Sequence, residues 1–279
     1  MKQCAWRLVT TLTLLALLHS TAMAQSSVSA QPSLQVKRDI TRLLVDTLPD
    51  HNIDPQRLPG RFQRQVIKRV YEYTALYRRD MQNMLQRATP FLPMMKRTLK
   101  QHGLPAYFAY IPMVESAFRV NASHPKSGAR GLWQLMPATA RGYGLKVSSH
   151  IDERIDPKRA TQAAARYLKN LQKRFGRQSP LHILAAYNHG DANLAKAMRR
   201  HRTRDIWHLY TYRYLPYQTR DYLIKMVTLW VVMAHADYFD FTLDDTVFPA
   251  LYSALTPPSA MAITAVLQHS PAIPTVQND

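Results

Sequence analysis

The sequence lacks the residues and motifs that several common kinds of functional site require. It contains one cysteine, Cys4, in 279 residues. A single thiol excludes an intramolecular disulfide framework and a metal site built from cysteines. With 8 glycines the chain has no glycine-rich phosphate loop, and neither an HExxH nor a G-x-S-x-G motif occurs. The histidines show no metal-ligand spacing, so we expect no metal ion and no cofactor.

Acidic residues are also few. The chain has 18 Asp and Glu against 37 Lys and Arg, a formal net charge of +19. Such an excess predicts an anionic partner, which could be nucleic acid, an acidic lipid surface or an acidic polymer. Hydrophobic residues make up 46% of the chain, enough to build a packed core, so wholesale disorder is excluded. The length fits one domain of about 200 residues with flanking segments.

The N-terminus has the features of an export signal. Leu8–Leu18 is an uncharged, mostly apolar run that is too short to span a bilayer as a helix. Lys2 and Arg7 precede this run, and the small-x-small pattern Ala22-Met23-Ala24 follows it. We therefore expect a cleavable signal peptide over residues 1–24, with a membrane anchor as the alternative if cleavage fails.

Export narrows the choice of partner. Cys4 precedes the apolar run, so it cannot be a lipid-attachment cysteine and is lost on cleavage. The expected location is the periplasm. An exported basic protein does not meet nucleic acid, so polymers of the bacterial envelope become the favoured partner.

The rest of the chain predicts a mainly α fold. Apolar residues recur at helical spacing over Gln65–Leu85, and we expect no strand pair between residues 35 and 235. Start and stop signals predict further helices: Leu92–Leu99 closing near Gly103, one from Asp156-Pro157 to Gly176, one from Ser179-Pro180 to Gly190, and a long one over Pro216–Ala236.

Three segments follow the signal peptide in the predicted organisation. Residues 25–59 form a lead with a short helix, residues 60–238 the main helical domain, and residues 239–279 a partly disordered extension. Short apolar runs over 239–253 could add a small β-hairpin. Arg199, Arg200, Arg202 and Arg204 are the densest basic cluster, which a solvated helix end explains.

One acid stands in an apolar setting. In the run Leu104–Phe118, Glu115 is the one group that titrates below tyrosine. Desolvation raises the pKa of a carboxyl group, and a proton donor to a glycosidic oxygen needs that condition at neutral pH. Taken alone, the feature favours a plainer interpretation, in which the glutamate points to the polar side of its helix or pairs with an arginine.

Two further segments strengthen the functional interpretation. In Gly128–Pro137, Trp133 offers a flat face to a sugar ring and Gln134 an amide that both donates and accepts. Trp133 fits a core position equally well. The second segment, Ala185–Gly190, ends a helix with a Tyr-Asn pair, which a helix C-cap also explains.

Taken in order, these segments resemble the lytic transglycosylase catalytic domain of glycoside hydrolase family 23, of the membrane-bound murein transglycosylase D type. The resemblance spans roughly residues 60 to 238. Its motifs are Glu115-Ser116-Ala117-Phe118, Gly131-Leu132-Trp133-Gln134, Met136-Pro137-Ala138-Thr139 and Ala186-Tyr187-Asn188-x-Gly190, with weaker echoes at Asp152–Pro157 and Thr219–Tyr222.

The resemblance implies a lysozyme-like helical fold that acts on peptidoglycan with Glu115 as a single catalytic acid and base. It also implies a set of residues that line or order the substrate site: Ser123 or Ser127, Gln134, Met136, Tyr187, Asn188 and Tyr222. Both serines are candidates because the spacing from Glu115 to Gln134 is one residue longer than expected.

Most glycosidases use two carboxylates, whereas the motifs here contain one acid. One suffices if the 6-hydroxyl of N-acetylmuramic acid attacks its own anomeric carbon and forms a 1,6-anhydro ring. We therefore expect cleavage of the β-1,4 bond between N-acetylmuramic acid and N-acetylglucosamine without water. Two alternatives stay open: a lysozyme-type hydrolase, and a non-catalytic protein that binds peptidoglycan and accompanies envelope machinery. The sequence leaves the oligomeric state open.

Overall fold

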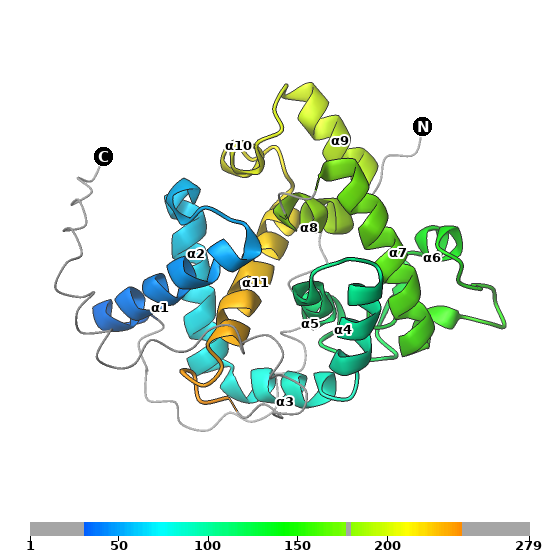
Figure 1. Cartoon of the computed structure of the whole chain (residues 1–279), viewed down its shortest axis with the longest axis horizontal. Helices are drawn as coiled ribbons and strands as arrows, with labels where there is room; N and C mark the ends of the chain where they lie inside the picture. The colour runs from blue at the N-terminus through cyan, green and yellow to red at the C-terminus, as the bar shows by residue number, and fades with distance from the viewer. Residues whose placement is uncertain (1–30, 177–179, 242–279) are drawn as a thin grey trace. The chain divides into compact units, whose positions relative to one another are not determined.

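The computed structural model describes residues 31–176 and 180–241, which fold mainly as α-helices (Figure 1). The predicted signal peptide and all but the first residues of the C-terminal extension lie outside the described residues. The helices are α1 (Leu34–Thr47), α2 (Gly60–Tyr71), α3 (Arg78–Ala88), α4 (Leu92–Gln101), α5 (Ile111–Ser116), α6 (Pro137–Gly142), α7 (Pro157–Phe175), α8 (Pro180–His189), α9 (Asp191–Arg200), α10 (Ile206–Thr211) and α11 (Tyr217–Ala234).

Five shorter turns connect these helices: η1 (Pro49–His51), η2 (Pro55–Arg57), η3 (Glu72–Leu76), η4 (Ala106–Tyr110) and η5 (Glu153–Ile155). The central element is α11, which packs against α2, α8, α1 and α5. It is buried from Tyr222 to Met233 except at Lys225, because apolar side chains predominate over that stretch. None of the described helices combines the length and the apolarity needed to cross a membrane.

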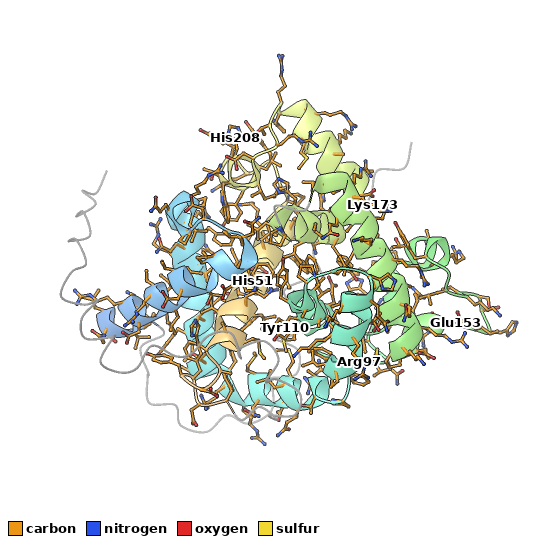
Figure 2. All side chains as sticks on the ribbon, in the orientation of Figure 1. His51, Arg97, Tyr110, Glu153, Lys173 and His208 are labelled. Atoms are coloured by element: carbon orange, nitrogen blue, oxygen red, sulfur yellow. The ribbon has the colours of Figure 1, made fainter. Side chains whose placement is uncertain are left out.

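Aromatic stacking fixes the segment after α1 to α11. The His51 ring, labelled in Figure 2, lies 4.3 Å from the Trp230 ring and 4.7 Å from the Tyr107 ring. The Thr47 hydroxyl lies 3.0 Å from the His235 Nε2. Burial lowers the pKa of both histidines, so both rings are neutral at neutral pH.

The predicted helix boundaries around α7 and α8 are confirmed. The Asp156 side chain accepts from the Arg159 amide at the start of α7, and Pro157 is its first residue. Gly176 and Gly190 follow the last residues of α7 and α8, with φ of 89° and 88°. Glycine adopts this region without the steric cost that other residues meet, which is why both helices stop there.

The regular helical spacing predicted over Gln65–Leu85 is wrong near its centre. Glu72–Leu76 forms a π-type turn between α2 and α3, closed by a bond from the Tyr77 amide to the Glu72 carbonyl of 2.7 Å. The wider turn rotates the following face, so Leu76 and Tyr77, which the stripe places inward, are 41% and 42% exposed.

The expectation of no strand pair between residues 35 and 235 is also wrong. Strands β1 (Ser123–His124) and β2 (Ala129–Arg130) pair antiparallel, with Ser123 opposite Arg130. Two residues a strand are too few to produce an alternating pattern in the sequence. The candidate hairpin over 239–253 lies almost wholly outside the described residues.

The loop after β2 approaches η5 so closely that only glycine fits at position 131. Gly131 has φ of 80°, and a Cβ there would lie 1.9 Å from the Arg154 carbonyl oxygen. We predict that Gly131→Ala lowers the free energy of unfolding by about 2–4 kcal/mol, through strain and displacement of η5. Urea denaturation measures this loss.

The matched control is Gly142→Ala. A Cβ at Gly142 in α6 meets nothing within 4 Å, so this variant should be neutral or gain up to about 1 kcal/mol. Equal effects at the two glycines would contradict the close approach at Gly131.

Candidate active site

Glu115 lies in the last turn of α5, a helix of six residues. The residue as a whole is partly exposed. The apolar surroundings nevertheless raise its pKa to about 7, and Tyr222 and Lys225 oppose that rise. This desolvated carboxyl group is what the apolar run predicts, and it can carry a proton at neutral pH.

One face of α11 supplies the groups opposite Glu115. The Tyr222 hydroxyl is buried and faces Glu115 without reaching ordinary hydrogen-bond geometry. Burial, followed by the charge of Glu115, raises the pKa of Tyr222 well above its ordinary value, so this phenol stays protonated. Lys225 stands one turn further along the helix and is the cation that lowers the pKa of Glu115.

A chain of ion pairs holds Lys225 in place. Its Nζ lies 2.8 Å from Oδ2 of Asp221, and Oδ1 of Asp221 lies 3.1 Å from Nη2 of Arg69 on α2. The Arg69 Nε in turn lies 2.9 Å from Oε2 of Glu72. Asp221 is therefore shared by two cations, whereas Glu115 itself forms no ion pair with any described residue.

The backbone directly after Glu115 is strained. Ala117 and Phe118 have φ of 49° and 57°, a region that costs non-glycine residues about 1 kcal/mol or more each. The Arg87 Nε donates to the Ala117 carbonyl over 2.9 Å, and the Phe118 ring is buried and stacked on Phe91. These contacts hold the tight end of α5 and thereby the position of Glu115.

The loop 128–136 lies beside α5 and receives donors from three helical elements. Leu132, Trp133 and Leu135 are buried, so their carbonyls need hydrogen-bond donors. The donors are the Ser116 hydroxyl to Leu132 (2.9 Å), the Tyr187 hydroxyl to Trp133 (2.7 Å) and the Arg154 guanidinium to Leu135 (3.0 Å) and Gly128 (2.6 Å).

Within this loop Trp133 occupies a core position, so it does not offer its ring face to a sugar. Its side chain is fully buried, and its indole Nε1 donates to the Thr161 hydroxyl over 3.0 Å. Gln134 has φ of 45°, and its amide nitrogen donates to the carbonyls of Ala122 (3.0 Å) and Gly131 (2.8 Å). The Gln134 amide therefore closes the loop on itself. Met136 is partly exposed directly before α6.

The two candidate serines lie on the hairpin. The Ser127 hydroxyl lies 2.9 Å from Nδ1 of His124 and accepts from the Ala129 amide, so it shapes the turn between β1 and β2. Ser123 is exposed on β1. In the part of the chain that the structure describes, no hydrogen bond joins either serine to Glu115.

The Tyr-Asn pair at the end of α8 lies close to Glu115. The charge of Glu115 adds to the burial that raises the pKa of Tyr187. Oδ1 of Asn188 accepts from the Thr219 hydroxyl over 2.9 Å, which fixes the amide with its oxygen toward α11. The Tyr187 ring also lies 5.4 Å from the Tyr167 ring, so aromatic packing continues from the site onto α7.

The structure thus brings Glu115, Tyr187 and Tyr222 together, with the Gln134 loop alongside. The sequence interpretation missed Lys225, and it included Thr219 and Arg154 only in the weaker motif matches, without a role for either. Helical spacing could have found Lys225, since a residue three positions after Tyr222 shares its face. No group of three His, Cys, Asp or Glu side chains in residues 31–176 and 180–241 could hold a metal ion.

The sequence is similar to a known family and to curated proteins. The family described as "Transglycosylase SLT domain" matches residues 93–210. Membrane-bound lytic murein transglycosylase D of Escherichia coli (strain K12) is 31% identical over 185 residues, covering 64% of this chain and 40% of that protein. A putative tributyltin chloride resistance protein of Alteromonas sp. (strain M-1) is 35% identical over 112 residues, covering 40% of this chain and 53% of that protein.

The chain therefore spans less than half of the length of the curated transglycosylase that it matches. Among solved structures, an inactive variant of lytic transglycosylase Slt from Pseudomonas aeruginosa aligns with a TM-score of 0.45 and 20% identity. That alignment covers 78% of this chain and 40% of the other.

The raised pKa of Glu115 makes stability depend on pH. The unfolded carboxyl ionises near 4.5 and the folded one near 7, so the folded state loses stability as the pH rises between these values. Glu115→Gln has no such loss. We predict that this variant equals the natural protein in stability at pH 4 and exceeds it by about 2 kcal/mol at pH 8.

Urea unfolding at both pH values measures this difference. Glu153→Gln is the matched control, because Glu153 accepts from the Lys146 amide and pairs with the exposed Arg159 side chain. The control should show no gain at pH 8. A gain for Glu153→Gln, or none for Glu115→Gln, would contradict the assignment of the raised pKa to Glu115.

Substitutions at two buried threonines on α11 test whether the Thr219 hydroxyl holds the Asn188 side chain in place. Thr219→Val removes the donor to Asn188 and should cost about 1 kcal/mol of stability. The Thr228 hydroxyl is buried without a hydrogen-bond partner among the described residues, so the same substitution there should be neutral or stabilise by about 1 kcal/mol. Thermal unfolding of both variants measures the contrast, and equal changes would argue against it.

Proposed function

Because the chain carries a transglycosylase SLT domain over residues 93–210, we propose that it cleaves the glycan strands of peptidoglycan as a lytic transglycosylase. The bond broken is the β-1,4 linkage between N-acetylmuramic acid and N-acetylglucosamine. Glu115 acts as the single acid and base, and the product ends in a 1,6-anhydro ring.

The observation that carries this proposal is the state of Glu115. Its pKa of about 7 keeps about half of the carboxyl groups protonated at neutral pH, in a residue that is partly exposed. The cation that moderates this pKa, Lys225, is itself shared with Asp221. A carboxyl that holds its proton at neutral pH suits a general acid for a sugar leaving group.

The proposed steps need no second carboxylate. Glu115 protonates the oxygen of the leaving N-acetylglucosamine while the bond from the anomeric carbon to that oxygen breaks. The resulting carboxylate then takes the proton from the 6-hydroxyl of the same N-acetylmuramic acid. That oxygen bonds to the anomeric carbon, which returns Glu115 to its acid form and consumes no water. Attack within one sugar benefits from a high effective concentration.

The surrounding residues would order the substrate around Glu115. Tyr222 is a neutral donor facing the carboxylate formed in the first step. Asn188, held by Thr219, presents its amide at the end of α8. Gln134, Met136 and the exposed Ser123 would contact the glycan from the loop and the hairpin.

We also place the protein in the periplasm after removal of residues 1–24. The basic charge of the sequence supports this assignment, since the peptide side chains of peptidoglycan carry carboxylates that attract a cationic protein.

Mass spectrometry of digested peptidoglycan tests the proposal. We expect the natural protein to release muropeptides lighter by one water than hydrolysis products. Glu115→Gln should reduce their yield by at least about 100-fold, because the proton donor is lost. Glu153→Gln should digest at the natural rate.

Two other outcomes have defined meanings. Reducing-end products that have gained water would replace the transglycosylase with a lysozyme-type hydrolase. Absence of cleavage by the natural protein, together with co-sedimentation with cell walls, would support the non-catalytic binding alternative.

A further inference from the structure

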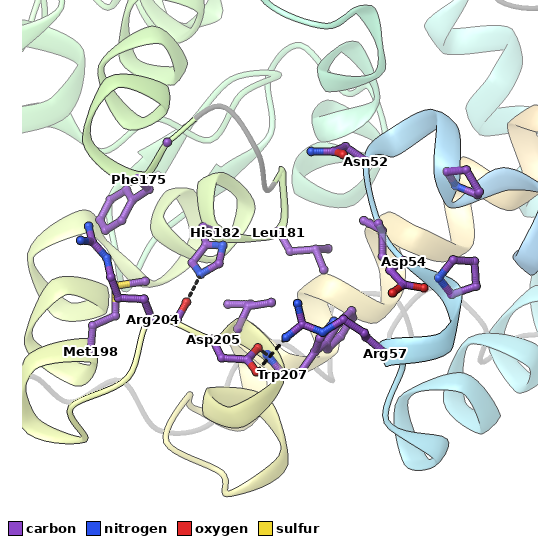
Figure 3. A pocket seen from close by; sticks show the side chains of 15 residues that line it. Asn52, Asp54, Arg57, Phe175, Leu181, His182, Met198, Arg204, Asp205 and Trp207 are labelled. Carbon is purple, nitrogen blue, oxygen red and sulfur yellow. Dashed lines mark hydrogen bonds and ion pairs between the residues drawn. The ribbon is translucent and has the colours of Figure 1, made fainter.

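A cavity of about 1030 Å³ lies between the segment after α1 and the start of α8 (Figure 3). Residues 49–57 form one wall, and the end of α7, the end of α9 and the α9–α10 loop form the other. Leu181 and His182, in the first turn of α8, lie between these walls. A cavity of this volume admits a ligand the size of a short peptide.

The cavity lies apart from Glu115. Its contact with α8 is at Leu181 and His182, whereas Tyr187 and Asn188 stand in the last turn of the same helix. Six residues of helix separate the two ends by about 9 Å along the axis. A ligand in this cavity would therefore not occupy the space beside Glu115.

Buried apolar side chains form part of the inner surface of the cavity. Leu181, Ile53 and Ile206 line it, and each is buried. Across it, the Arg57 guanidinium lies 3.1 Å from Oδ2 of Asp205, which also caps α10. That ion pair joins the two walls, and each of its charges already has a partner.

Two opposite charges remain without such a partner. Arg204 and Asp54 are exposed at the cavity, and Figure 3 shows them on opposite sides of it. Neither side chain has an ion-pair partner among the described residues. Asp54 accepts from the Gln56 amide with Oδ1, which leaves Oδ2 available. The His182 Nε2 bonds to the Arg204 carbonyl, which fixes the backbone that carries the guanidinium.

We propose that this cavity binds a short zwitterionic peptide. A ligand carboxylate would pair with Arg204, a ligand ammonium with Asp54, and alkyl groups between them would contact Leu181 and Ile206. An anion alone would leave Asp54 unpaired, and a cation alone would leave Arg204 unpaired. The peptide stems of peptidoglycan have this chemistry, and naming them as the source rests on the proposed function.

Calorimetric titration of the full chain tests the site. The probe is the N-acetylated stem tetrapeptide L-Ala-γ-D-Glu-meso-diaminopimelate-D-Ala, which keeps one ammonium group and several carboxylates. We expect Arg204→Gln and Asp54→Asn each to weaken binding at least tenfold. Acetylation of the ammonium group of the probe should weaken its binding to the natural protein. The same acetylation should not weaken its binding to Asp54→Asn, which lacks the carboxylate that pairs with the ammonium group.

Arg200→Gln is the matched control. Arg200 belongs to the same basic cluster and is exposed, but it does not line the cavity. Its binding should equal that of the natural protein. Thermal midpoints of all three variants should match, because Asn retains the cap acceptor of Asp54 and Arg204 contributes only its backbone to the fold.

The outcomes separate clearly. The site would be overturned if the natural protein did not bind the probe at millimolar concentration. It would also be overturned if Arg204→Gln, Asp54→Asn and the natural protein bound the probe equally. Equal affinity for N-acetyl-Ala-Glu-Lys-Ala would keep a zwitterionic peptide site and overturn the stem as its source. Repeating the titration with Glu115→Gln separates this result from cleavage, so failure of one proposal is distinguishable from failure of the other.

Discussion

The buried carbonyl groups of the loop 128–136 are the constraint on which the site depends. A carbonyl removed from water needs a donor, and leaving it without one costs about 1–3 kcal/mol. Here the donors come from α5, α8 and η5, through Ser116, Tyr187 and Arg154. Satisfying one loop therefore brings together three segments that are far apart in the sequence. The position of Glu115 follows, since Ser116 is its neighbour on the last turn of α5.

Among the three donors, Arg154 makes the most hydrogen bonds to the loop. Its guanidinium is 6% exposed and pairs with Asp152 over 2.8 Å while donating to two carbonyls of the loop. A buried cation is tolerated only when its charge and its donors are all used. Gly131 completes the fit, since its lack of a side chain lets the loop lie against the Arg154 carbonyl. The loop and η5 therefore form one unit beside the site.

Much of this could be predicted from local sequence, and the rest could not for physical reasons. Caps and stops fixed α7 and α8 because Asp156, Gly176 and Gly190 act within their own turns. The apolar run around Glu115 likewise indicated a desolvated acid. The break at Glu72–Leu76 and the short hairpin depend on contacts across the fold, which periodicity does not record. The hydrogen bond from the Tyr187 hydroxyl to the Trp133 carbonyl could not be predicted from the sequence, because every residue has a backbone carbonyl and none is marked as the acceptor.

The charge balance around Glu115 explains why its pKa stays near neutrality. Burial alone would raise it further, since Tyr222 and Lys225 both oppose that rise. A fully free Lys225 would pull harder and ionise the acid at lower pH. Asp221 reduces that pull because its carboxylate lies 2.8 Å from the lysine, and Arg69 holds Asp221 in turn. The ion pairs between α2 and α11 therefore act on the pKa of Glu115 through one shared carboxylate.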